Sequence, residues 1–116
     1  MFFYPEEEYR PHLVEPLARL TREGVTDVEV HIHHDGEGEQ DFMERMRRFV
    51  ETLSGSHGLL RRQEGRPVFG FIHGNWALDN ARRDRRWCGV NDELRVLRKS
   101  GCYDDFTLPS APRETQ

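Results

Sequence analysis

The segment VEVHIH at residues 28–33 alternates apolar and polar residues without a break. Successive side chains of a β-strand point to opposite faces of the sheet, so this period of two predicts a strand. The β-branched residues of the segment share one face, which we expect to be buried. Glu29, His31 and His33 share the other face, and this pattern places two imidazoles on one side of the carboxyl end of the strand.

Similar patterns on both sides of this segment predict three helices and three more strands. The predicted helices lie at residues 11–23, 42–53 and 90–99, and the predicted strands lie at residues 2–4, 67–72 and 105–108. Strands that alternate with helices predict crossover connections and a parallel sheet. The expected fold class is α/β, with a parallel sheet of about four strands and crossover helices.

The length of the chain limits it to one domain. We place this domain at residues 1–110 and a flexible tail at residues 111–116. A closed barrel of eight parallel strands needs about 250 residues. The chain is therefore expected to be a small open sheet or a piece of a larger (β/α) barrel, and the early start of its first strand favours a piece. Exposed sheet edges can pair with a second copy, which predicts a homo-oligomer as one form of assembly.

The composition excludes several classes of protein. The formal net charge of −4 gives no general attraction to nucleic acid or to anionic membranes. No apolar run approaches the roughly 20 residues of a membrane span, and the N-terminus lacks the features of a signal peptide. Cys88 and Cys102 form neither a disulfide framework nor a cysteine metal site. We therefore expect a cytoplasmic protein that binds neither nucleic acid nor a membrane.

Three histidines and an aspartate crowd the end of the strand at residues 28–33: His31, His33, His34 and Asp35. The carboxyl ends of strands carry the active site in parallel α/β folds. Imidazole is a good zinc ligand, and a catalytic zinc site takes about three protein ligands and leaves one position for water. Asp35 or Glu37 can supply the third ligand or the base. The alternative interpretation is a chance grouping of histidines in a surface loop.

The strand at residues 67–72 leads into a further candidate metal ligand, His73. In a parallel sheet His73 emerges at the same edge as His33, and Gly74 allows the backbone to approach a ligand closely. The predicted cofactor is a divalent metal, in first place zinc, although imidazole and carboxylate ligands also suit iron and nickel.

The connection at residues 74–89 is longer than most loops, and long loops are often functional. We predict that Asp79, like Asp35, is catalytic. The residues predicted to bind substrate are Asn75, Trp76, Asn80 and Arg82. The alternatives are that the tryptophans lie in a core beneath the loop, and that the arginines at residues 82–86 are either solvated or a phosphate site.

These features resemble the polysaccharide-deacetylase superfamily, whose members are distorted α/β barrels that remove acetyl groups from amino sugars with a divalent metal. The family has a strand of the type Glu-Ile-Gly-x-His, which the sequence Glu29-Val30-His31-Ile32-His33 resembles. The resemblance covers roughly residues 27–108 and implies that His33 binds the metal. The passage FGFIHGNWALDN at residues 69–80 also resembles larger deacetylase-like bacterial proteins.

The chain departs from the family pattern at three places. Glu37 stands where the family has its second metal histidine, and the Thr-Phe-Asp-Asp-Gly motif is absent. The sequence His73-Gly74-Asn75 replaces the Arg-x-Pro-aromatic motif.

Three hypotheses follow from the sequence. The first is a metal-dependent hydrolase that deacetylates a carbohydrate. The second is an amidohydrolase or phosphoesterase, because His-x-His followed by aspartate also occurs in those sites. The third is an inactive fragment that acts only as an assembly module.

Overall fold

Four parallel strands in the order β1-β2-β4-β5 form the centre of this computed structural model, which describes residues 1–108. The strands are β1 (Phe2–Pro5), β2 (Val28–Ile32), β4 (Arg66–His73) and β5 (Cys102–Asp105). The helices that connect them in turn are α1 (Pro11–Arg22), α2 (Glu39–Glu51) and α3 (Glu93–Lys99). The predicted α/β fold with a parallel sheet is confirmed, and within the described residues the sheet is not closed as a barrel.

Shorter elements complete the described chain. They are the short 3₁₀ helices η1 (Glu6–Glu8), η3 (Gly74–Trp76) and η4 (Leu78–Asn80), the π-helical segment η2 (Thr52–Ser56), and the strand β3 (Arg61–Gln63), which pairs antiparallel with β4. The tail predicted at residues 111–116 and the end of the domain predicted at residues 1–110 lie outside the described residues.

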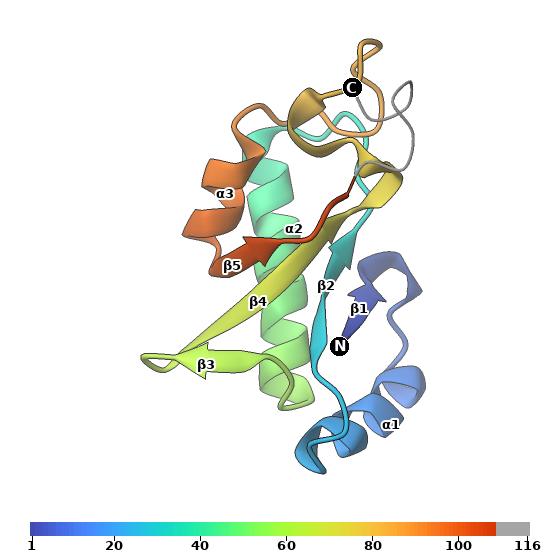
Figure 1. Cartoon of the computed structure of the whole chain (residues 1–116), viewed down its shortest axis with the longest axis vertical. Coiled ribbons are helices and arrows are strands. Elements are labelled where there is room, and N and C mark those ends of the chain that lie inside the picture. Colours follow the sequence, from blue (N-terminus) through green and yellow to red (C-terminus); the bar gives the residue numbers. More distant parts are fainter. Residues whose placement is uncertain (109–116) are drawn as a thin grey trace.

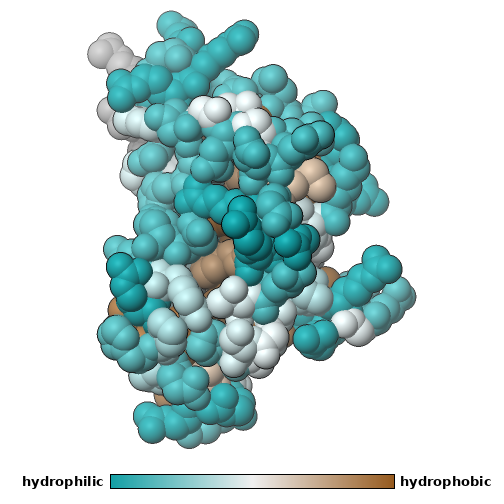
Figure 2. Space-filling model, turned by 180° about the vertical axis from the view of Figure 1, so that it is seen from behind, coloured by the Kyte–Doolittle hydropathy of each residue, from teal (hydrophilic) through white to brown (hydrophobic). Residues whose placement is uncertain are grey.

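The core lies between the sheet and the helices α2 and α3; in Figure 1, α2 passes behind the sheet and α3 lies beside α2. The apolar face of β2 behaves as its alternation predicted, because Val28, Val30 and Ile32 are all buried. The apolar stripe of α2 meets this face, and Phe42 of the stripe packs edge-on against Phe71 of β4. From the helix side the surface is mostly hydrophilic (Figure 2), so the outer faces of these helices are solvated.

Among the described residues, the sheet carries a buried carboxylate, Glu29, which is 1% exposed. Its Oε2 accepts a hydrogen bond from the backbone N–H of Gly70 (2.5 Å), and its Oε1 accepts one from the hydroxyl of Tyr103 (2.6 Å). The pairing of β4 with β5 shifts register between Phe69 and Gly70, so the Glu29 side chain satisfies a backbone donor at an irregular point in the ladder. Burial and the Glu29 hydrogen bond raise the pKa of Tyr103 to about 12.

Two boundaries differ from the sequence prediction. The last strand spans Cys102–Asp105 and not residues 105–108, because Thr107 turns back to bond the Asp105 carboxylate with its own N–H and hydroxyl. The third helix begins at Glu93 and not at residue 90, because Asp92 has a left-handed backbone (φ 54°). Among the described residues, no helix has both the length and the apolar character that a membrane span requires.

Candidate metal centre

The carboxyl ends of β2 and β4 lie side by side, with Ile32 paired to His73. The long loop after β4 covers this edge at the top of Figure 1. The loop is tied to the end of β2 by two hydrogen bonds: the N–H of Gly36 donates to the carbonyl of Cys88 (2.6 Å), and the N–H of Trp87 donates to the Asp35 carboxylate (2.6 Å). These contacts bring segments that are distant in sequence to one place.

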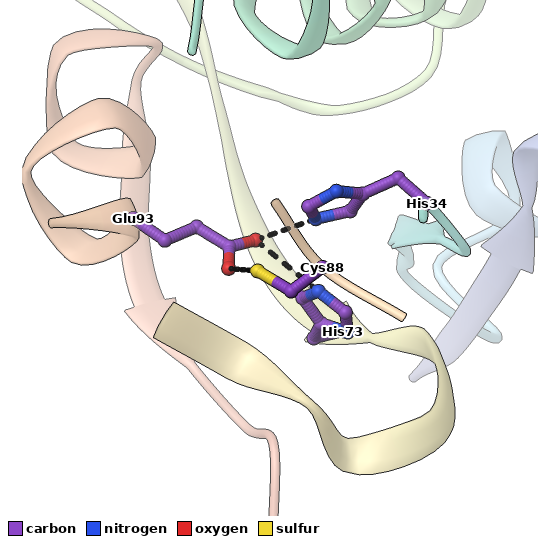
Figure 3. A group of neighbouring side chains, drawn as sticks. All are labelled: His34, His73, Cys88 and Glu93. Carbon is purple, nitrogen blue, oxygen red and sulfur yellow. Dashed lines mark hydrogen bonds and ion pairs between the residues drawn. The ribbon is translucent and has the colours of Figure 1, made fainter. Parts of the chain in front are cut away.

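Four side chains converge at this edge and form what we call the cluster: His34, His73, Cys88 and Glu93 (Figure 3). Each offers one atom able to bind a metal, and these atoms all lie within 4.8 Å of one another. All four residues are at most 3% exposed. His34 follows β2, His73 ends β4, Cys88 lies in the loop and Glu93 opens α3, so the cluster ties together most of the fold.

The Glu93 carboxylate is at the centre of the hydrogen bonds of the cluster. Its Oε1 lies 2.9 Å from Nε2 of His34 and 3.5 Å from Nε2 of His73. Its Oε2 accepts a hydrogen bond from the Cys88 thiol (3.2 Å). Burial is the largest influence on the pKa of Glu93 and acts to raise it, but the His34 hydrogen bond and the charge of His73 outweigh it, so the pKa lies below its ordinary value.

Burial shifts the pKa values of His73 and Cys88 in the directions that favour the neutral forms of these side chains. The pKa of His73 is lowered, mainly by burial, with Glu93 acting in the opposite direction. The pKa of the Cys88 thiol is raised to about 11 by burial and by the nearby Glu93 carboxylate. Without a cation in the cluster, burial therefore disfavours the charged forms of both side chains.

The His73 ring is oriented as a metal ligand would be. Its Nδ1–H donates to the carbonyl of Gly74, which leaves the lone pair on Nε2 directed into the cluster. This buried Nε2 makes no hydrogen bond within the described residues. The neighbouring His34 ring is held by stacking on Phe42, with 4.2 Å between ring centroids. A bound cation would explain why this buried nitrogen has no hydrogen bond and faces three other atoms that can bind a metal.

The structure places the other predicted metal histidines outside the cluster. His33 pairs with Glu7 through Nδ1 (2.5 Å), at the half-exposed rim of the sheet. His31 lies beside it, with 4.6 Å between the ring centroids, and its Nδ1 bonds the carbonyl of Ile72 (2.9 Å). The pKa of His31 is lowered, first by burial and then by His33. The two rings thus share one face, as the alternation predicted, but the cluster forms around His34 instead.

The predicted catalytic aspartates both accept hydrogen bonds from backbone groups, one in the loop and one at the start of α3. Asp35 accepts from the N–H of Trp87, and Asp79 accepts from the N–H of Glu93 (2.7 Å). Both carboxylates thus hold the segment that carries Cys88 and Glu93.

The predicted substrate-binding residues lie along the loop. Trp76 is 44% exposed, and Asn75 has a left-handed backbone. Asn80 bonds Gly89 and Asn91, and Arg82 pairs with Asp84 and lies over the ring of Trp87 (4.1 Å).

Sequence reasoning did not identify two members of the cluster, Cys88 and Glu93. Cys88 is a single cysteine in a loop, and Glu93 resembles any acidic residue in the first turn of a helix. A useful signal would have been that Cys88 lies in, and Glu93 follows, a long loop that starts directly after a candidate metal histidine.

Surface hollows lie away from the cluster. One is lined by α2, the β3–β4 hairpin and the end of α3, a second by α3 and β5, and a third by η1 and α2. In the described part of the chain, none of the four cluster residues lines any of these three.

No protein-family model, curated protein or solved structure matches this chain, so its resemblance to the deacetylases stays a prediction.

Proposed function

We propose that this protein binds a divalent transition metal, in first place zinc, through the four residues of the cluster. The observation that carries the proposal is the convergence of two imidazoles, a thiol and a carboxylate, all buried, within 4.8 Å. These are the ligand types that zinc takes in proteins. A bound cation would also stabilise Glu93 and a Cys88 thiolate, which are otherwise costly to bury.

Two of the donor spacings are close to those around a tetrahedral ion, whereas the widest, at up to 4.8 Å, would have to shorten on binding. Bonds of about 2.1 Å to nitrogen or oxygen place tetrahedral donors about 3.4 Å apart, and bonds to sulfur place them slightly farther apart. The observed separations from Glu93 Oε1 to His34 and His73 are 2.9 Å and 3.5 Å. With four protein donors and almost no exposure, the cluster resembles a closed structural site more than an open catalytic one.

The test is the metal content of the purified full chain, measured by mass spectrometry after exposure to zinc and removal of loose metal. We expect one equivalent in the wild type and in two matched controls, Cys102→Ser and His57→Gln, whose side chains lie outside the cluster. We expect less than one equivalent in Cys88→Ser and His73→Gln. A wild type that retains no metal would refute the proposal, as would equal retention by the cluster variants and their controls.

A second candidate function is the metal-dependent hydrolase predicted from the sequence, with an acetylated carbohydrate as substrate. It is favoured by the position of the cluster, at the carboxyl edge where parallel α/β enzymes place their active sites. A zinc ion bound there would supply a Lewis acid for an acetyl carbonyl and for water. This function requires one of the four protein ligands to yield its position to water, with Asp35 or Asp79 as the proposed base.

The hydrolase is tested on the zinc-loaded protein with N-acetylated oligosaccharides, with an amide and with a phosphate ester. Release of acetate that disappears in His73→Gln would support a deacetylase. Turnover of the phosphate ester or the amide alone would instead support a phosphoesterase or amidohydrolase. Stoichiometric zinc with no turnover of any of the three would refute hydrolysis of these substrates and leave a structural metal site.

A further inference from the structure

The turn η4 presents two successive peptide N–H groups to the cluster. The N–H of Asp79 donates to Glu93 Oε2 (2.8 Å), and the N–H of Asn80 donates to the sulfur of Cys88 (3.3 Å). Glu93 and Cys88 are the two members that would carry negative charge as metal ligands. The turn therefore faces both anionic donors and neither of the imidazoles.

Side chains of the same turn fix the segment that carries these donors. Asp79 Oδ1 accepts from the N–H of Glu93 (2.7 Å), so Asp79 and Glu93 hold each other by a reciprocal pair of hydrogen bonds. Asn80 Oδ1 accepts from the N–H of Gly89 (2.8 Å), and Asn80 Nδ2 donates to Asn91 (3.0 Å). The turn is thus hydrogen-bonded to the chain at Gly89, directly after Cys88, and again at Glu93.

These hydrogen bonds depend on an unusual backbone conformation. Asp79 and Asn80 both lie in the left-handed region, with φ of 60° and 54°. Such a conformation is costly for most residues, and least so for glycine, asparagine and aspartate. Two consecutive left-handed residues turn successive N–H groups toward one concave site, an arrangement suited to negatively charged groups.

We infer that the turn at Asp79 and Asn80 positions Cys88 and Glu93 and thereby sets the affinity and coordination number of the metal centre. The inference rests on the proposed metal binding. Groups that orient metal ligands typically contribute a factor of about 10 to 100 in metal affinity. Without the turn, Glu93 loses the hydrogen bonds at its Oε2 and at its backbone N–H that orient it on the loop side, and solvent can enter the coordination sphere of the ion.

The test uses zinc and cobalt, because four-coordinate cobalt(II) absorbs visible light strongly and six-coordinate cobalt(II) absorbs it weakly. The variants Asp79→Gly and Asn80→Gly keep the left-handed backbone and remove the side-chain anchors. Asp79→Asn keeps an oxygen that can accept from Glu93. Glu64→Gly is the matched control, since Glu64 is an exposed left-handed residue (φ 51°) between β3 and β4.

We expect the two glycine variants at the turn to bind zinc about 10 to 100 times more weakly and to lose intensity in the visible bands of cobalt. Asp79→Asn should retain most of the affinity, and Glu64→Gly all of it. Unchanged affinity in both turn variants would overturn the inference. Weaker binding with an unchanged cobalt spectrum would overturn it as well, because the turn would then act on stability alone. Failure of the wild type to bind either ion would refute the proposed metal binding itself.

Discussion

Replacing Gly74 with alanine should loosen the fold at the metal centre. A Cβ at this position would overlap with Cδ2 and Cγ of the His33 ring and would lie 2.8 Å from the α-carbon of His33. The ring is half-exposed and can rotate away, but the α-carbon belongs to the backbone and cannot. The ends of β2 and β4 would therefore have to separate, and these ends carry His34 and His73 into the cluster.

The size of the effect follows from this unavoidable overlap with the backbone. Overpacking a well-packed site costs about 1 to 3 kcal/mol, and a clash that no rotamer relieves belongs near the upper end. We expect the free energy of unfolding to fall by about 2 to 3 kcal/mol. For a domain of this size the corresponding fall in Tm is about 8 to 12 °C. Gly55→Ala is the control, because no atom lies within 4 Å of its added Cβ and its stability should change by less than about 1 kcal/mol.

The assay is urea unfolding followed by circular dichroism, together with zinc titration of each variant. Gly74→Ala should lower the urea midpoint without changing the slope, and it should weaken zinc binding. Adding His33→Ala to Gly74→Ala should recover little of this loss, because the ring can rotate away in either case while the overlap with the His33 backbone remains. If Gly74→Ala unfolds at the same midpoint as the wild type, the inferred close approach of the two strand ends does not constrain the protein.

Three further predictions concern titration, thiol reactivity and the sheet. Burial lowers the pKa of His73 in the folded protein, so the unfolded chain binds more protons than the folded one near pH ~6.5. The stability of the metal-free protein should therefore fall as the pH drops from about 7.5 to 5.5. His73→Gln should flatten that dependence in urea midpoints, and an equally steep profile would contradict the assignment. Burial is the main reason that the pKa values of Cys88 and Cys102 are raised, to about 11 and about 12. A disulfide reagent at mild alkaline pH should therefore modify both thiols only after urea is added, and rapid reaction of the folded chain would contradict this prediction. Tyr103→Phe removes a hydrogen bond to the buried Glu29 carboxylate and should lower the free energy of unfolding by about 1 to 2 kcal/mol, while zinc binding stays unchanged. An unchanged free energy of unfolding in urea would show that this hydrogen bond does not stabilise the fold.

The sheet could be predicted from the sequence because its evidence is local. The alternation at residues 28–33 determines which face of β2 is buried, and the spacing of apolar residues determines the face of α2. The end of the sheet could not be predicted in this way. Residues 102–105 contain two aspartates, and their pairing with β4 skips Tyr103, so this strand has no regular apolar alternation that the sequence could reveal.

The candidate site was predictable only as a location. Histidines at the carboxyl ends of two parallel strands indicate the edge at which His34 and His73 meet. Which histidine of the group enters the cluster depends on how the chain turns after β2, and alternation says nothing about that turn. Cys88 and Glu93 reach the cluster through the left-handed residues of a long loop, which leave no periodic pattern in the sequence.

The hydrogen bond from His34 to Glu93 spans 59 positions of the chain. A zinc finger whose ligands lie a few residues apart can be nucleated by its ion, because the loops that the ion must close are short. Here His73, Cys88 and Glu93 all lie within residues 73–93, whereas His34 lies half the protein away, so an ion could bind the three nearby donors early but could complete the site only when His34 arrives. The full colour of four-coordinate cobalt should thus appear during refolding only after β2 has paired with β4, and a nascent chain from which α3 has not yet emerged would still lack the Glu93 ligand.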